Sequence, residues 1–266
     1  MNDDTLTRID RLEKQILLSE TYTVKAFWQS LNHAYRLTLP TRSLCCLICD
    51  YRDKRSGFSI LTDSCQFGGG ELERYQCPQC DCVFGPQKYL DLEENFVDLD
   101  YRLLYSRYSE SDSSPNEIKT FHSLAPKHDG LYLDWGCGGE WSPTITKLRA
   151  HGWDVWGYDP SASQSNPYVV NSRDSISARF DGIFSNNVIE HFRNPVRQFC
   201  QFHKMLKEGG KMSHSSPCYE YCYAFTRFHT LFLIGRSADI LAERTGFKIT
   251  NRVKDGEYIN IVFERI

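Results

Sequence analysis

The stretch Leu131-Tyr-Leu-Asp134-Trp-Gly136-Cys-Gly138-Gly-Glu140 decides the fold of this chain. A short apolar run ends in an acidic residue, and a turn of small residues follows it. Ser142 and Pro143 then suit the N-cap and the first position of a helix. A second apolar run, residues 153–158, ends in Asp159. This order of strand, glycine turn, helix, strand and acid predicts a βαβ unit that holds a nucleoside.

Each part of this unit has a physical role in binding. Gly136 and Gly138 let the backbone turn sharply and approach a ligand closely. The helix that follows presents unpaired N–H groups and the positive end of its dipole. Asp134 can hold a cationic or N–H-bearing group, and Asp159 lies where an acid grips a ribose diol.

The pattern is not the G-x-G-x-x-G dinucleotide fingerprint. It reads D-x-G-x-G-x-E, and it resembles the first motif, D/E-x-G-x-G-x-G, of the class I S-adenosylmethionine-dependent methyltransferases. Asp134, Gly136 and Gly138 match that motif, whereas Glu140 stands where the third glycine usually is. This departure leaves three readings open: a shifted helix start, a weakened cofactor site or a non-catalytic relative.

Later segments extend the resemblance over residues 126–266. The matching pieces are Phe180-Asp181, Glu190-His191 and Pro195 around a fourth strand, Gly209-Gly210 before a fifth, Gly246-Phe247 after a helix, and a hairpin around Asp255-Gly256. The resemblance implies an α/β fold: a Rossmann-like, seven-stranded methyltransferase sheet with an antiparallel terminal hairpin, preceded by helices and a small zinc ribbon.

The resemblance also implies S-adenosylmethionine as the cofactor and a set of residues around it. The expected cofactor contacts are Asp134, Gly136, Gly138, Asp159, Asn186, Asn187, Tyr105 and Tyr108. The two asparagines follow the fourth strand. The two tyrosines belong to a stripe in residues 91–125 that is predicted to be a helical connector, packed either as core or as a lid over the site.

Histidines are the candidates for removing a proton from an acceptor hydroxyl. His191 follows the fourth strand, and its alternative role is to pack against the next helix. His229 lies in an aromatic insertion after the fifth strand, a segment that builds the acceptor pocket in such enzymes. His214 lies within the fifth strand and is predicted to be a core residue. Arg227 is either an anion-binding group for the acceptor or a solvated side chain.

The cysteines predict a metal site of their own. The chain has 11 cysteines, an odd number, and no export signal, which argues against a disulfide scaffold. Two C-x-x-C pairs can turn four sulfurs toward one point, which predicts structural zinc on Cys46, Cys49, Cys77 and Cys80. Cys45 and Cys82 are close enough in sequence to compete. The alternative is a reduced, metal-free cluster.

These motifs divide the chain into four parts. Residues 1–40 are predicted to form two amphipathic helices with a break at residues 19–21, packed on the body or on a partner subunit in a homo-oligomer. Residues 41–90 form the zinc ribbon, residues 91–125 the connector, and residues 126–266 the methyltransferase domain.

The composition narrows the function further. A net charge of -3 disfavours a general nucleic-acid binder, and the absence of a long apolar run or a signal peptide predicts a soluble, cytoplasmic protein without membrane contact. With the zinc ribbon included, the chain resembles a ribbon-bearing subgroup of these enzymes, whose members are often sugar- and glycan-modifying enzymes. The resemblance therefore implies a small-molecule acceptor such as a sugar, a nucleotide-sugar or a glycan end. The alternatives are an RNA- or protein-directed enzyme that docks through the ribbon, and a non-catalytic scaffold.

Overall fold

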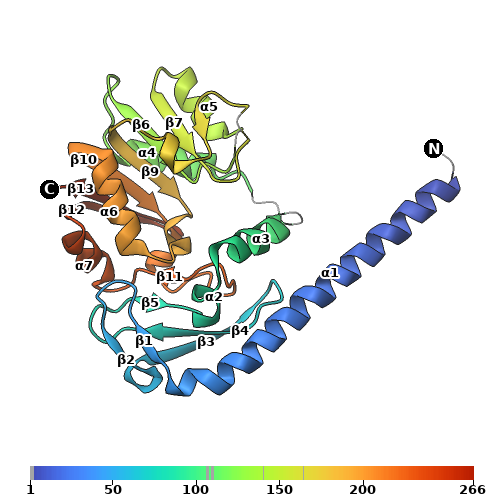
Figure 1. The fold of residues 1–266 in the computed structure, drawn as a ribbon. Coiled ribbons are helices and arrows are strands. Elements are labelled where there is room, and N and C mark those ends of the chain that lie inside the picture. Colours follow the sequence, from blue (N-terminus) through green and yellow to red (C-terminus); the bar gives the residue numbers. More distant parts are fainter. Residues whose placement is uncertain (1–2, 106–107, 109–110, 140, 164) are drawn as a thin grey trace.

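The computed structural model describes residues 3–105, 108, 111–139, 141–163 and 165–266. A seven-stranded sheet with its helices makes up one half of the body, and small sheets near the N-terminal end of the chain make up the other half (Figure 1). A long N-terminal helix, α1, runs along the small sheets and projects beyond the body.

The large sheet has the strand order β12-β13-β10-β9-β6-β7-β8. Strands β10, β9, β6, β7 and β8 are parallel, while β13 pairs antiparallel with both β10 and β12. The predicted seven-stranded sheet with an antiparallel terminal hairpin is therefore confirmed. The strands are β6 (Leu131–Trp135), β7 (Asp154–Tyr158), β8 (Val169–Val170), β9 (Phe180–Asn186), β10 (Leu206–Ser215), β12 (Phe247–Asp255) and β13 (Tyr258–Arg265).

Helices cover both faces of this sheet. Tyr132 and Leu133 are both buried neighbours on β6, and successive strand residues point to opposite faces. Tyr132 joins a cluster with residues of α4 and α5, whereas Leu133 joins the cluster of α6 and α7. These helices are α4 (Ser114–Ser123), α5 (Pro143–Ala150), α6 (Pro195–Met205) and α7 (Ser237–Arg244), with 3-10 turns η3 (Arg173–Ser175), η4 (Ile189–His191) and η5 (Pro217–Tyr219).

Local sequence explains where these helices begin. The Ser142 side chain accepts a hydrogen bond from the backbone N–H of Ile145, and Pro143 occupies the first turn of α5, as predicted. Asn194 caps α6 in the same way, ahead of Pro195. Helices α5 and α6 therefore begin shortly after β6 and η4, the two segments that border the candidate site.

The small sheets form around the two cysteine pairs. Strands β1 and β2 make one sheet, and the other has the order β11-β5-β4-β3. The sequence-distant strand β11 belongs to the aromatic insertion after β10, and its pairing with β5 joins the two halves of the molecule. The elements are β1 (Ser43–Cys45), β2 (Arg52–Lys54), η2 (Arg55–Gly57), β3 (Ser59–Cys65), β4 (Gly70–Gln76), β5 (Val83–Phe84) and β11 (Leu231–Phe232).

The N-terminal region is one helix, α1 (Asp3–Thr38), followed by η1 (Leu39–Thr41), so the predicted break at residues 19–21 is wrong. The hydroxyls of Thr21 and Thr23 bond to carbonyl oxygens four residues earlier, which lets polar residues continue the helix. Trp28 is buried against the body, but the leucine and isoleucine side chains between Leu6 and Leu18 are exposed. Homo-oligomer formation through α1 stays a prediction that a measurement of solution mass can test.

Two further helices, α2 (Gln87–Leu90) and α3 (Glu94–Tyr105), lead from the small sheets toward the large one. The last part of the predicted connector forms α4, which packs on β9 and β10 as a layer of the large sheet. Across the described ranges, no helix combines the length and the apolar character needed to cross a membrane.

His214 on β10 is a fully buried core residue, as predicted. Its Nδ1 lies 2.7 Å from Ser185 Oγ, and desolvation lowers its pKa to about 3. An unfolded histidine, with a pKa of about 6.5, binds a proton more readily, so this group destabilises the fold as pH falls from 6.5 toward 3. Urea unfolding of the wild type should lose about 2 kcal/mol between pH 7.5 and 5 through His214. In a His214→Asn variant, the unfolding free energy should fall less steeply between pH 7.5 and 5. An unchanged pH dependence would contradict the conclusion that His214 causes this loss.

Candidate functional site

The glycine turn after β6 forms an open backbone cradle. Gly136, Gly138 and Gly139 all have positive φ angles, of 78°, 76° and 100°. A Cβ on Gly136 would lie 2.7 Å from Val188, whereas a Cβ on Gly138 or Gly139 would meet no atom of the described chain within 4 Å. Gly136 is therefore needed for packing, and the other two glycines leave room for a ligand beside the backbone. Glu140, the departure from the motif, lies outside the described residues.

Asp134 places a buried carboxyl at the end of β6. Its side chain is 1% exposed, and its Oδ2 has no hydrogen-bond partner within the described part of the chain. Burial raises its pKa well above the usual range, and the neighbouring carboxylates of Glu117 and Asp159 raise it further. An unsatisfied buried oxygen beside two acids suits a cationic or N–H-bearing ligand group.

Glu117 was not among the predicted site residues. It lies in the first turn of α4 and accepts hydrogen bonds from Ser113 and from Thr144 on α5. Ser114-Pro-Asn-Glu117 matches the capping-box pattern, which marks a helix start. That pattern could have placed the glutamate at a helix terminus, but it carries no information about the distance to Asp134.

Asp159 lies at the end of β7, across the turn from Asp134. Its Oδ2 accepts a hydrogen bond of 3.0 Å from the backbone N–H of Gly138, and its Oδ1 accepts one of 2.8 Å from the N–H of Ser161. The carboxylate therefore fixes the shape of the glycine turn. Because the side chain remains partly exposed, it can also receive hydrogen bonds from a ligand.

The two predicted asparagines follow β9. Asn186 accepts a hydrogen bond of 2.7 Å from Ser215 Oγ, and the backbone N–H of Asn187 donates to Ser215 O at 2.9 Å. Asn187 has φ of 55°, a left-handed conformation that ends the strand and leaves its side chain exposed.

The tyrosine stripe divides into a packed and an exposed part. Tyr101 packs edge-on against His191 and Phe228. Tyr105 and Tyr108 are 41% and 44% exposed, and their rings lie 6.2 Å apart. Their contact with a cofactor stays a prediction.

His191 and His229 lie together although they come from η4 and from the aromatic insertion. Their ring centroids are 5.0 Å apart at an interplanar angle of 71°, and both side chains are partly exposed. Desolvation lowers the pKa of His191 to about 4, and desolvation together with the neighbouring His191 lowers that of His229 well below its usual value. Both rings are therefore neutral near pH 7.

Backbone carbonyls fix the orientation of both rings. His191 Nδ1 lies 3.1 Å from Phe228 O, and His229 Nδ1 lies 3.0 Å from Tyr223 O. A carbonyl oxygen only accepts hydrogen bonds, so we assign the proton of each neutral ring to Nδ1. The second nitrogen of each neutral ring is then unprotonated.

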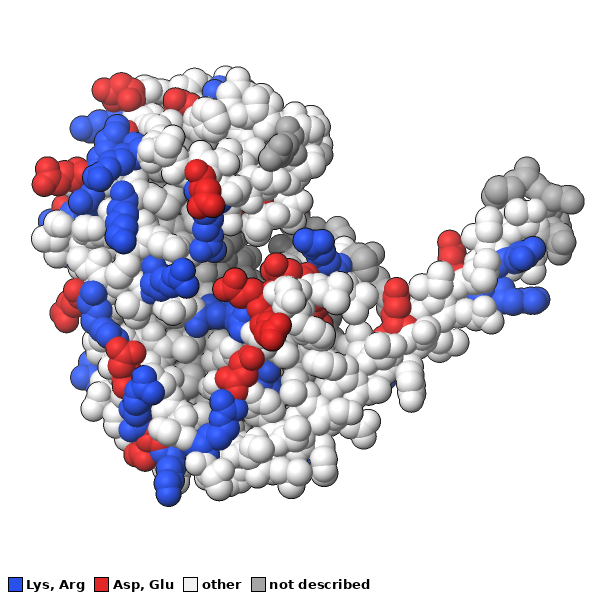
Figure 2. Space-filling view, viewed as in Figure 1, with Lys and Arg blue, Asp and Glu red and all other residues white. Residues whose placement is uncertain are grey.

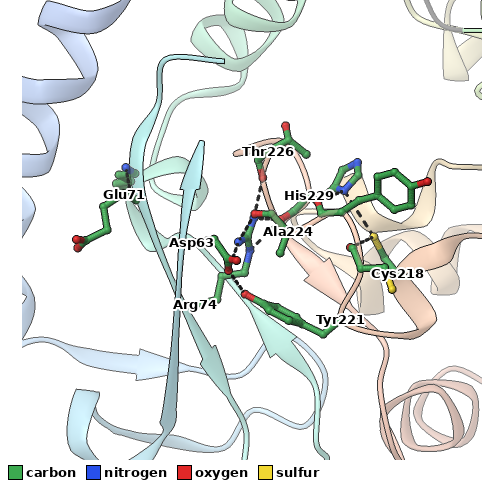
Figure 3. Close-up of polar contacts among 11 residues, drawn as sticks. Asp63, Glu71, Arg74, Cys218, Tyr221, Ala224, Thr226 and His229 are labelled. Atoms are coloured by element: carbon green, nitrogen blue, oxygen red, sulfur yellow. Dashed lines mark hydrogen bonds and ion pairs between the residues drawn. The ribbon is translucent and has the colours of Figure 1, made fainter. Parts of the chain in front are cut away.

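Arg74 on β4 fastens the insertion to the small sheet (Figure 3). The guanidinium is fully buried and donates to Ala224 O at 2.8 Å, to Thr226 O at 2.7 Å and to His229 O at 3.1 Å. Asp63 faces it from β3 at 3.5 Å and also accepts a hydrogen bond from Tyr221. The sheet beside the cysteines thus sets the position of His229.

Arg227 is neither solvated nor open to an acceptor anion, so both sequence interpretations are wrong. It is 2% exposed and donates to both carboxylate oxygens of Asp100 on α3 at 2.7 Å. Its guanidinium also lies 5.0 Å from the ring of Trp28 on α1. This buried pair ties α1, α3 and the insertion together, a contact that sequence distance conceals.

The four predicted zinc ligands converge. One sulfur each from Cys46, Cys49, Cys77 and Cys80 lies within 4.8 Å of the others, with Cys46–Cys80 at 3.4 Å and Cys49–Cys77 at 3.5 Å. Sulfurs bound to one tetrahedral zinc are about 3.8 Å apart, so this donor set fits the ion. Zinc binding itself stays a prediction.

The two competing cysteines differ in position. The Cys45 thiol contacts the Cys46 carbonyl at 3.7 Å. Cys82 is fully buried next to the cluster, where hydrogen bonds from Cys80 and Cys82 lower the pKa of Cys46. Cys82 is therefore a fifth candidate ligand for the zinc ion.

Comparison with known proteins adds a family match. A family model described as "Methyltransferase domain" matches residues 108–252. No curated protein matches the chain.

Several solved structures are similar in part. A Mesorhizobium loti S-adenosylmethionine-dependent methyltransferase is 14% identical, with 56% of this chain and 98% of that chain covered and a TM-score of 0.43. The Burkholderia thailandensis 1,6-didemethyltoxoflavin-N1-methyltransferase, solved with S-adenosylhomocysteine, is 16% identical, with 73% and 95% covered and a TM-score of 0.47. The glycopeptide N-methyltransferase MtfA is 13% identical, with 66% and 99% covered and a TM-score of 0.46.

Proposed function

This chain belongs to the methyltransferase domain family, and from that premise we propose that it transfers a methyl group from S-adenosylmethionine to a hydroxyl of a small acceptor. The acceptor class that we propose is a sugar, a nucleotide-sugar or the end of a glycan. The observation that carries the proposal is the buried carboxyl of Asp134 beside the open glycine turn, because its Oδ2 has no hydrogen-bond partner among the described residues.

The residues present fit the cofactor. Asp134, Gly136, Gly138 and Asp159 form the cradle, and together with Asn186 and Asn187 they would hold the nucleoside and amino-acid parts. We propose that the exposed rings of Tyr105 and Tyr108 cover these parts. The cofactor would supply a methyl group on a positively charged sulfonium. The carboxylates of Glu117 and Asp159, which lie close enough to Asp134 to raise its pKa, place negative charge near such a cation.

On the acceptor side, the paired histidines would take up the hydroxyl proton. Both rings are neutral near pH 7, and each has one unprotonated nitrogen. Tyr223 and Phe225 lie in the same insertion with ring centroids 5.6 Å apart. Exposed aromatic rings such as that of Tyr223 suit stacking against a sugar ring.

The runner-up is an enzyme that grips RNA or a protein through the ribbon. Figure 2 shows Lys and Arg interleaved with Asp and Glu on the face in view, which disfavours a polyanion there. The ribbon also makes contacts within the chain: Arg236 bonds to Asp81 and Arg244 to Asp50, so α7 holds both cysteine loops. These contacts favour a scaffold role for the ribbon.

An acceptor screen tests the proposal. Purified protein with its zinc intact would be incubated with labelled S-adenosylmethionine and either nucleotide-sugars and oligosaccharides or transfer RNA. We expect transfer to the sugar class. Turnover on RNA alone would refute the acceptor, and calorimetry without any cofactor binding would refute enzyme and cofactor together.

Asp159→Asn should weaken cofactor binding by about 10-fold, because one charge-assisted hydrogen bond is worth about 1.5 kcal/mol or more. Calorimetric titration with S-adenosylmethionine measures the effect. Asp154→Asn is the matched control, since Asp154 begins the same strand and pairs with Arg149 at the surface. Equal affinity in Asp159→Asn and the wild type would remove Asp159 from the site.

Arg74→Met should cost about 3 kcal/mol of unfolding free energy, because it leaves three buried carbonyl oxygens without donors. Turnover should fall with cofactor affinity unchanged, since only the insertion that carries His229 loses its anchor. Arg55→Met is the control, because Arg55 pairs with Glu73 on the same strand and is half exposed. Matching kcat values for the two variants would show that the clamp does not position His229.

A further inference from the structure

We propose that Glu190, His191 and His229 bind a divalent transition-metal cation at the acceptor side of the site. The binding stands on the geometry alone, while the role of the cation rests on the proposed function. This centre is additional to the four-cysteine cluster, with which it shares no residue.

The three side chains already converge. One nitrogen from each ring and one carboxylate oxygen lie within 4.8 Å of one another. Two ligands at bond lengths of 2.0–2.2 Å from a common cation are at most about 4.4 Å apart, so small side-chain movements complete the site. The rings meet at 71° and are not stacked, a geometry in which two lone pairs can point at one ion.

The backbone holds the two contributing segments together. The N–H of Thr230 donates to Glu190 O at 2.9 Å, and the His191 ring bonds back to Phe228. The residues on both sides of His229 are thus tied to the turn that carries Glu190 and His191. The arrangement therefore exists before any ion binds.

The hydrogen bonds of the two rings are those of metal-binding histidines. Such histidines donate their other N–H to a carbonyl or a carboxylate, which sets the tautomer and the direction of the free lone pair. His191 donates to Phe228 O and His229 donates to Tyr223 O. The same outer contact thus occurs twice, on rings from two separate elements.

The donor set defines the class of ion. Two imidazoles and one carboxylate suit iron(II), manganese, cobalt or zinc, and three protein ligands leave positions open for other groups. Glu190 is 1% exposed, so its carboxyl group lies in a site of low polarity, where the attraction between a carboxylate and a cation is strong.

The location gives the cation a role. Val188, two residues before Glu190, packs against Gly136 of the cofactor cradle. A cation in this position lowers the pKa of a hydroxyl that enters an open coordination position, and the released proton passes to water. The histidines would then act on the acceptor through the ion they hold.

Cobalt(II) is the probe for this site. The full chain, with zinc loaded first, would be dialysed to remove weakly held metal and titrated with Co²⁺ while absorption spectra and calorimetry are recorded. We expect one Co²⁺ per chain in addition to zinc, with a spectrum of nitrogen and oxygen ligands and without the intense sulfur bands of a cysteine site. Glu190→Gln keeps the shape of the side chain, and it should weaken Co²⁺ binding by more than about 10-fold, as should His229→Ala.

The controls separate this proposal from the proposed function. His33→Ala, which removes an exposed histidine on α1, should leave Co²⁺ binding unchanged. No Co²⁺ beyond the cysteine cluster, or unchanged binding in both Glu190→Gln and His229→Ala, would overturn the metal site. Cofactor binding measured on the same samples tests the methyltransferase assignment, because Asp134 and the glycine turn do not depend on the cation.

Discussion

His191→Ala and His229→Ala each lower the turnover of the acceptor by about 10²–10⁴-fold, the usual contribution of a positioned proton-transfer group. The affinity for S-adenosylmethionine changes little, because the proposed cofactor contacts lie on the other strands and turns. Single-turnover kinetics with saturating cofactor measures the first effect, and calorimetry the second. The physical cause is the loss of an oriented imidazole that takes part in removing the acceptor proton, either directly or as a ligand of the proposed cation.

Two variants make this result specific. His203→Ala removes a histidine on α6 whose ring packs on Phe247, so kcat should stay near the wild-type value. In the double variant of His191 and His229, turnover should fall by much less than the product of the two single effects, because the rings act as one unit. Unchanged turnover in both single variants would show that the acceptor needs neither ring.

The sequence was sufficient to predict the large sheet because its signals are local. Asp134, the glycines and Ser142 lie within a dozen residues, and each determines the backbone next to it. The C-x-x-C pairs are equally local, since each pair defines its own tight loop. What they predicted, the strand–turn–helix unit and the convergence of four sulfurs, is present in the structure.

The rest depends on contacts between distant segments. Arg74 and His229 are separated by 155 positions, and Arg227 and Asp100 by 127, so no local pattern joins them. Arg227 looked like a surface residue because a lone arginine usually is one. The pairing of β11 with β5, together with the hydrogen bonds of Arg74, brings the insertion onto the small sheet, where both guanidinium groups are buried.

Helix α1 shows a different limit of prediction from sequence. Ser19 and Thr21 have lower helix propensity than their neighbours and stand between two amphipathic runs, where a break was predicted. Two such residues cost little beside the cooperative extension of a long helix, and threonine hydroxyls can bond to the preceding turn. Intrinsic propensity alone therefore overestimated the chance of a break.

Cys77→Ser should abolish zinc binding and cost several kcal/mol of stability, because the binding energy of structural zinc is folding energy, about 10 kcal/mol or more in small zinc domains. Zinc counted after dialysis should fall from about one per chain to none, with a large drop in Tm. Cys200→Ser on α6 is the control thiol outside the cluster. Wild-type protein without zinc would refute the metal site.

The Cys82→Ser variant tests whether Cys82 is one of the zinc ligands. We expect it to retain zinc, because the Cys46, Cys49, Cys77 and Cys80 sulfurs already suit one tetrahedron. Loss of zinc in this variant would move Cys82 into the ligand set.

Loss of zinc should also disturb the position of His229 on the acceptor side of the site. Strand β4 ends at Gln76, directly before Cys77, and carries the Arg74 clamp on the insertion. The cysteine loops are in turn held by Arg236, the N-cap residue before α7, and by Arg244 at the end of α7. Disordering these loops would release β4, and with it His229, while the glycine turn and Asp134 on β6 keep their own packing. Zinc-depleted protein should therefore lose turnover before it loses cofactor binding; simultaneous loss of both would indicate global unfolding.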